Sequence, residues 1–180
     1  ISVLSSSEVF SQLSLQWVKY TNGSSDTSDE EARSLCIDNN FNVNIAGSGA
    51  GNVYKILKYD TFGTLRWNFY YPGGAANKII FNGNDNYFIS GSNGLLKLTS
   101  LGKLSLIRSG NIADIILGKD NKIYSSGDSS NQIILTQKYD LNGSLIWSKV
   151  YGAPYYRYFF NYLFQGVDNK VNVMGRYATF

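Results

Sequence analysis

The sequence has no histidine, only one cysteine and only two prolines in 180 residues. Without histidine it lacks the side chain that most often transfers protons near neutral pH, and the usual ligand of most zinc sites. A single cysteine, Cys36, excludes an intrachain disulfide. It stands in the apolar run Leu35-Cys36-Ile37, without a histidine to act as its base, so we expect a small buried apolar residue rather than a nucleophile.

Charge is also scarce, because 16% of the residues are charged and the net charge is +3. The lysines and arginines are scattered, which argues against nucleic-acid binding. No apolar run is long enough for a transmembrane segment. The sequence contains no GxSxG, HExxH, CxxC or P-loop motif, so it predicts no catalytic residue, no metal site and no cofactor.

Glycine and tyrosine are frequent, with 18 and 14 residues. Short runs of Tyr, Ile, Val and Trp alternate with Gly, Asn and Ser punctuation, which is typical of an all-β protein. No segment keeps an apolar period of about 3.6 residues, as an amphipathic helix would. The composition therefore predicts short strands joined by tight turns.

One phrase occurs repeatedly along the chain. Residues 58–73 read KYDTFGTLRWNFYYPG, and residues 138–152 read KYDLNGSLIWSKVYG. Residues 97–110, KLTSLGKLSLIRSG, form a copy between them without the tryptophan and the Tyr-Asp pair, and residues 13–23, LSLQWVKYTNG, form an earlier one. The spacing is about 40 residues, which indicates a repeat architecture.

The echoed residues have structural roles in this prediction. An aspartate suits a turn because its side chain can bond nearby backbone amides, and a glycine supplies a positive φ. The tyrosines and tryptophans can pack across the hairpin or onto the next repeat. The structural repeat residues are Trp17, Trp67, Trp147, Tyr59, Asp60, Gly63, Tyr139, Asp140 and Gly143.

A second sequence pattern recurs with the same spacing of about 40 residues. It consists of a polar turn, a run of alternating apolar and polar residues, and a glycine. Its copies are NVNIAGS (42–48), NYFISGS (86–92), NKIYSSG (121–127) and NKVNVMG (169–175), and an apolar run precedes each. One repeat thus reads as four short antiparallel strands. Four strands per roughly 40 to 45 residues predict a β-propeller blade.

With these phrases the chain resembles the secreted bacterial β-propeller repeats of the SBBP type, and more loosely the quinoprotein-like and outer-membrane assembly-factor propellers. The resemblance covers about residues 13–177. It implies that the apolar strand is the inner one and the tryptophan strand the outer one. Such propellers carry many functions, so the resemblance concerns the fold.

The expected organisation is a partial propeller at 13–180, with about 3.5 blades. Residues 1–12 resemble the end of a secretory signal peptide; an ordinary N-terminal strand is the alternative. A larger propeller, of which this chain is a fragment, is preferred over a closed four-bladed ring. The expected parts are a lone outer strand at 13–20, blades at about 32–71, 76–109 and 111–151, and a half-blade at 156–177.

The candidate ligand-binding residues are Tyr155, Tyr156, Arg157 and Tyr158, in an aromatic stretch after the third blade. Amphipathic tyrosines beside an arginine can stack on sugars or hold a protein, although packing between blades is the simpler explanation for them. We expect a non-enzymatic, secreted or cell-surface binding or scaffold module with a protein or glycan partner. The alternative is the propeller of an extracellular enzyme, a quinoprotein-type oxidoreductase or a hydrolase or lyase whose catalytic residues lie outside this sequence.

Overall fold

The structure is a computed structural model that describes residues 15–20, 30–128, 133–152 and 156–179. For residues 106–107, 156–161 and 179 it describes the backbone alone. The signal-like residues 1–12 lie outside the described residues. Where the chain is described it forms β-strands, and it contains no helix that could span a membrane.

The strands form four antiparallel sheets, three of four strands and one of two, which confirms the all-β prediction. Sheet 1 contains β1 (Glu31–Ile37), β2 (Val43–Gly49), β3 (Val53–Tyr59) and β4 (Leu65–Pro72). Sheet 2 contains β5 (Ala76–Phe81), β6 (Asn86–Gly91), β7 (Gly94–Thr99) and β8 (Leu104–Arg108). Sheet 3 contains β9 (Asp114–Leu117), β10 (Ile123–Asp128), β11 (Ile134–Tyr139) and β12 (Leu145–Tyr151). Sheet 4 contains β13 (Tyr156–Gln165) and β14 (Val171–Thr179).

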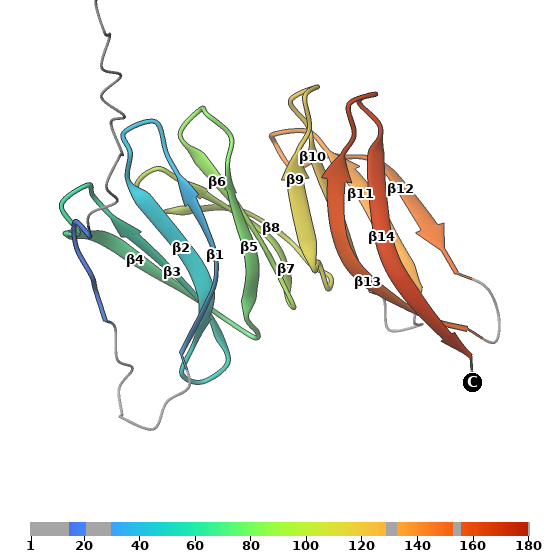
Figure 1. Ribbon diagram of the computed structural model, residues 1–180, viewed down its shortest axis with the longest axis horizontal. Helices are drawn as coiled ribbons and strands as arrows, with labels where there is room; N and C mark the ends of the chain where they lie inside the picture. The colour runs from blue at the N-terminus through green and yellow to red at the C-terminus, as the bar shows by residue number, and fades with distance from the viewer. Residues whose placement is uncertain (1–14, 21–29, 129–132, 153–155, 180) are drawn as a thin grey trace, which may run out of the picture.

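The sheets follow one another in chain order, as Figure 1 shows. Within each sheet every strand pairs with the next strand in sequence, so all connections inside a sheet are hairpins. The first strands of neighbouring sheets, β1, β5, β9 and β13, contact one another in turn. The repeat in the sequence therefore corresponds to a repeat in space, with one sheet per copy.

Apolar side chains fill the space between successive sheets. Tyr54 of sheet 1 and Tyr87 of sheet 2 are fully buried in the first cluster. Phe88 of sheet 2 packs with Tyr139 of sheet 3 in the second, and Leu163 of sheet 4 belongs to the third. Full burial of one such side chain contributes about 1.5–3 kcal/mol. Packing between sheets thus supplies the core that a single sheet lacks.

The turns between the third and fourth strands share one geometry. The amide of Gly63 donates to the carbonyl of Asp60, and the Asp60 carboxylate accepts the amides of Phe62 and Thr64. Asp140 and Gly143 repeat these contacts in sheet 3. The φ angle is 74° at Gly63 and 81° at Gly143, in the region where a side chain is strained.

An indole ring joins one sheet to this turn of the next. The Nε1–H of Trp67, in β4, donates to the carbonyl of Ser100 at 2.9 Å, and the Trp67 ring lies over Gly102. A Cβ on Gly102 would come within 2.8 Å of the ring. Glycine at this position therefore provides both the positive φ and the room for the indole.

Residues 15–20 repeat this contact on sheet 1, although they form no strand. The Nε1–H of Trp17 donates to the carbonyl of Thr61 at 3.1 Å, and its ring lies over Gly63. Tyr59 flanks the same ring, with 5.9 Å between the ring centroids. The segment therefore docks on sheet 1 as β4 docks on sheet 2, without the pairing expected of a strand at 13–20.

Sheet 2 lacks the tryptophan, and a lysine and an arginine make the contact with the turn of sheet 3 instead. The Nζ of Lys97 donates to the carbonyl of Leu141 at 2.8 Å, and the Nε of Arg108 donates to that of Gly143 at 2.9 Å. Leu141 stands in its turn where Ser100 and Thr61 stand in theirs. The sheet still has four strands, so the missing tryptophan changes the docking group and not the strand count.

Trp147, the last tryptophan of the repeat, packs at the junction of sheets 3 and 4. Its ring meets the ring of Tyr124 edge-on, with 6.0 Å between the centroids. It adjoins the third apolar cluster, which contains Leu163.

We expect Gly102→Ala to destabilise the protein by about 2–4 kcal/mol, because it adds a left-handed penalty of roughly 1–2 kcal/mol and displaces the Trp67 ring. Urea unfolding monitored by tryptophan fluorescence measures this loss.

Gly51→Ala is the matched control, because Gly51 has a φ of 81° but no atom within 4 Å of its would-be Cβ. Its free energy of unfolding should fall by the left-handed conformational penalty alone. Equal losses in the two variants would contradict a role for the indole contact.

Candidate functional site

The structure places the predicted tyrosine-rich residues at the start of sheet 4. Tyr155 lies outside the described residues. Tyr156, Arg157 and Tyr158 are in β13, opposite Thr179, Ala178 and Tyr177 of β14, and their side chains are not described. Their role in binding stays a prediction.

A cavity of about 410 Å³ adjoins this region between sheets 3 and 4. Tyr151, Arg176 and Tyr177 contribute its polar and aromatic walls. One wall is β14, which pairs with β13 alone among the described strands. The cavity is thus bounded by an open sheet edge.

A larger cavity, of about 590 Å³, lies between sheets 1 and 2, and both its walls come from complete four-stranded sheets. We call it the turn cleft, because its lining comes largely from the turns of the two sheets. It is lined by Asp38, Asn39, Asn40, Asn42, Lys58, Asp60, Arg66, Trp67, Phe81, Asp85, Ser100 and Leu101.

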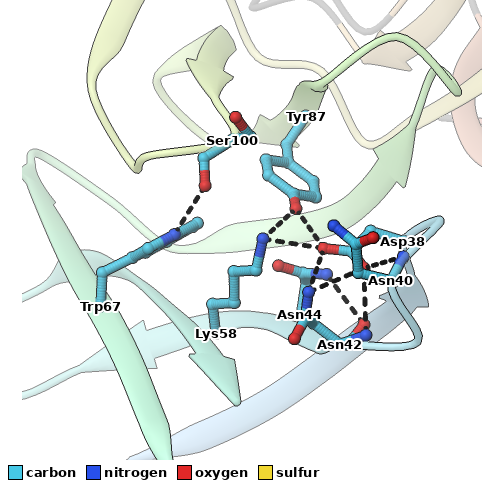
Figure 2. A network of polar contacts seen from close by, with 8 residues as sticks. All are labelled: Asp38, Asn40, Asn42, Asn44, Lys58, Trp67, Tyr87 and Ser100. Atoms are coloured by element: carbon cyan, nitrogen blue, oxygen red, sulfur yellow. Dashed lines mark hydrogen bonds and ion pairs between the residues drawn. The ribbon is translucent and has the colours of Figure 1, made fainter. Parts of the chain in front are cut away.

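Asp38 organises the floor of the turn cleft (Figure 2). Its Oδ1 accepts the backbone amides of Asn40 and Asn42, which closes the turn between β1 and β2. Its Oδ2 accepts the hydroxyl of Tyr87 at 2.8 Å and pairs with the Nζ of Lys58 at 2.8 Å. Lys58 also donates to the Tyr87 hydroxyl at 2.9 Å, which completes a triangle across the two sheets.

The contacts of this triangle shift the pKa values of Asp38 and Tyr87. Burial favours a protonated Asp38, but hydrogen bonds from Lys58, Asn42 and Tyr87 outweigh it and hold the carboxyl pKa well below its usual range. Burial and the neighbouring Asp38 carboxylate raise the pKa of the Tyr87 hydroxyl far above its usual range. The floor is therefore an ion pair between Asp38 and Lys58 beside the neutral hydroxyl of Tyr87.

Cys36 lies near this floor in a packed, apolar environment. Its side chain is half-buried and packs against the first apolar cluster. Burial and the Asp38 carboxylate raise the thiol pKa to about 12, so the thiolate is not populated near neutral pH. This environment agrees with the expectation of a small packing residue.

The rim of the turn cleft carries the groups that remain exposed. The Arg66 guanidinium lies 3.8 Å from the Asp60 carboxylate. Asp85 occupies a left-handed position with a φ of 58°, and its carboxylate makes no hydrogen bond or ion pair within the described part of the chain. The side chain of Asn39 donates to the carbonyl of Gly83 at 2.9 Å, which ties the two rims together.

Three carboxylates line the turn cleft, but they do not converge. Across the described ranges, no three acidic or cysteine side chains are grouped to hold a metal ion. Instead, side chains that accept and side chains that donate hydrogen bonds line the cleft together with the aromatic residues Trp67 and Phe81. Such a surface can bind a small ligand that both donates and accepts hydrogen bonds.

The sequence contained a partial signal for this cleft. Asp38, Asn39 and Asn40 were recognisable as a polar turn, and Lys58 belongs to the repeated KYD phrase. The sequence does not show that the turns of two successive repeats face each other.

No protein-family model matches the sequence, and no curated protein matches it. Among solved structures, the chain is similar to the computationally designed Ika4 protein, with a TM-score of 0.58 and 15% identity over 85% of this chain and 94% of that one. It is also similar to a protein of unknown function from Bacteroides caccae, with a TM-score of 0.49 and 15% identity over 74% of this chain and 49% of that one. At such identity the likeness to Ika4 concerns the fold alone.

We expect Asp38→Asn to lower the free energy of unfolding by about 3–5 kcal/mol, because it leaves the buried Lys58 ammonium without its counter-ion. Chemical denaturation at neutral pH measures the loss. The double variant with Lys58→Met removes both charges and should recover most of it. A double variant no more stable than Asp38→Asn would contradict this account of the triangle.

The pH dependence follows from the lowered pKa of Asp38. In the unfolded chain an aspartate titrates near about 3.9, so its stabilising effect is present above that pH and is lost as the pH falls toward the lower folded pKa. The wild-type protein should therefore lose stability below about pH 5 more steeply than the Asp38→Asn variant. Parallel acid profiles of the two proteins would count against the assignment.

Proposed function

We propose that the chain is part of a β-propeller and that it acts as a non-enzymatic, secreted or cell-surface binding module for a protein or glycan. The observation that carries the binding function is the turn cleft, which combines an aromatic wall with exposed donors and acceptors. The proposal also includes the propeller architecture and its completion by further sheets.

A constant step between sheets supports the propeller. The hydroxyl of Ser34, in β1, accepts the amide of Ile79 at 3.2 Å, and the carboxylate of Asp114, in β9, accepts that of Leu163 at 2.7 Å. Both acceptors stand four residues before the first turn of their sheet, and both amides belong to the next sheet. Sheets that repeat and contact the next sheet at matching positions fit the radial arrangement of propeller blades.

An exposed apolar residue on sheet 1 supports the proposal that a further sheet packs against it. Leu35 is 63% exposed, whereas Ile79 and Ile115 at the same repeat position are 2% and 0% exposed. Trp17 contacts the sheet 1 turn as the outer-strand tryptophan of a preceding sheet would. We therefore propose that residues 15–20 serve as the fourth strand of a sheet of the same ring that covers Leu35.

The locked floor of the turn cleft fits binding better than chemistry. Asp38, Lys58 and Tyr87 satisfy one another and hold the two sheets together, so the groups left for a ligand are those of the rim. Rigid backbone turns with exposed polar side chains bind ligands at little entropic cost. The secreted or surface location rests on the resemblance to SBBP-type repeats and on the signal-like start.

The test is binding with recovery of the ligand. The protein is immobilised and screened by interferometry against an array of oligosaccharides and a panel of extracellular proteins, and the bound molecules are analysed by mass spectrometry. We expect saturable binding of a ligand that is recovered unchanged. Chemical conversion of the ligand, or no saturable binding to either class, would overturn the proposal.

A further inference from the structure

We infer that the turn cleft binds a neutral saccharide through Arg66 and Asp85 on its rim, against the aromatic wall of Trp67 and Phe81. This inference rests on the proposed binding function and names the class of ligand. It is argued from three properties of the cleft: its charge, its hydrogen-bonding groups and its apolar surface.

The charge of the cleft disfavours an anionic ligand. Asp38 and Lys58 form a buried pair, and Asp60 lies beside Arg66, so these four groups cancel. Asp85 is the remaining charge among the lining residues and leaves the cleft one unit negative. A phosphate, sulfate or carboxylate would meet repulsion there, and one exposed carboxylate holds a cation weakly, by about 1 kcal/mol or less.

The hydrogen-bonding groups fit hydroxyls. The Asp85 carboxylate accepts, the Arg66 guanidinium donates, and the exposed Asn40 side chain can do both. The Nδ2 of Asn39 is occupied by Gly83, which leaves its amide oxygen as an acceptor. A sugar hydroxyl donates one hydrogen bond and accepts others, so adjacent hydroxyls can use these mixed partners together.

The apolar surface fits the C–H face of a sugar ring. The indole N–H of Trp67 is bound to Ser100, so the ring offers carbon surface to the cleft rather than a donor. Phe81 adds a second ring, and Leu101, at 72% exposure, stands at the edge. The cavity volume of about 590 Å³ lies within the range of small-ligand pockets, roughly 300–1,000 Å³.

The repeat itself supplies variants that the fold tolerates. Asn121 and Asn169 occupy the left-handed position that Asp85 occupies in sheet 2, so Asp85→Asn introduces a residue already used there. Arg66 is the extra residue at the bulge between β3 and β4, and Ser105 holds that place in sheet 2. Arg66→Ser is therefore the second test variant. Asn121→Asp, the reverse exchange in sheet 3, is the matched control.

The experiment titrates the wild-type protein and the three variants with neutral oligosaccharides of glucose, galactose, mannose and N-acetylglucosamine by calorimetry. Sialylated and sulfated glycans are measured in parallel. We expect a neutral glycan to bind best, with affinity reduced roughly tenfold in Asp85→Asn and in Arg66→Ser, since each removes one hydrogen-bonding group. Asn121→Asp should keep the wild-type affinity, and all variants should keep the wild-type unfolding midpoint within a few degrees.

Three results would overturn the inference. Preference for a sialylated or sulfated glycan would contradict the charge argument. Neutral-glycan binding that neither rim variant weakens would place the site elsewhere. Binding of a protein ligand with no glycan binding would exclude the saccharide. The last two results are compatible with the proposed binding function. Failure of the saccharide inference can therefore be distinguished from failure of the binding function.

Discussion

The structure depends on one kind of contact, in which a side chain from outside a sheet donates a hydrogen bond to the carbonyl of a turn of that sheet. Trp67 makes it to Ser100, and Trp17 makes it to Thr61. An antiparallel sheet of four short strands cannot bury both faces by itself. The contact gives the partly buried indole N–H of Trp67 a hydrogen-bond partner and places the ring over a glycine, so it aligns the sheets while their apolar faces pack.

The variation in sheet 2 shows which part of this contact is necessary. Lys97 and Arg108 replace the indole and donate to carbonyls of the same turn in sheet 3. A long cation can reach the carbonyl, and its stem can cover apolar surface. The requirement is therefore a donor of sufficient length on the third or fourth strand, and the indole is one of two kinds of side chain that meet it.

The sequence was informative where a residue acts on its own neighbourhood. Asp60 and Gly63 form a local turn with a positive φ, so their pattern can be recognised without a structure. The repeat of about 40 residues likewise indicates an all-β chain of short strands. Lys97 as the substitute for tryptophan was not predictable, because its partner Leu141 belongs to another repeat. The turn cleft was not predictable for the same reason, because Asp38 and Asp85 line one cavity from two different sheets.

The central claim is that the indole contact joins neighbouring sheets, and its most direct measurement is hydrogen exchange of the indole protons by NMR. The chain has three tryptophans, so three indole signals are expected. The Trp67 proton is bound to Ser100, and the account predicts that it exchanges only when sheets 1 and 2 separate, with protection close to that of the buried β6 amides. A Trp67 proton that exchanges as fast as an exposed indole would contradict the account.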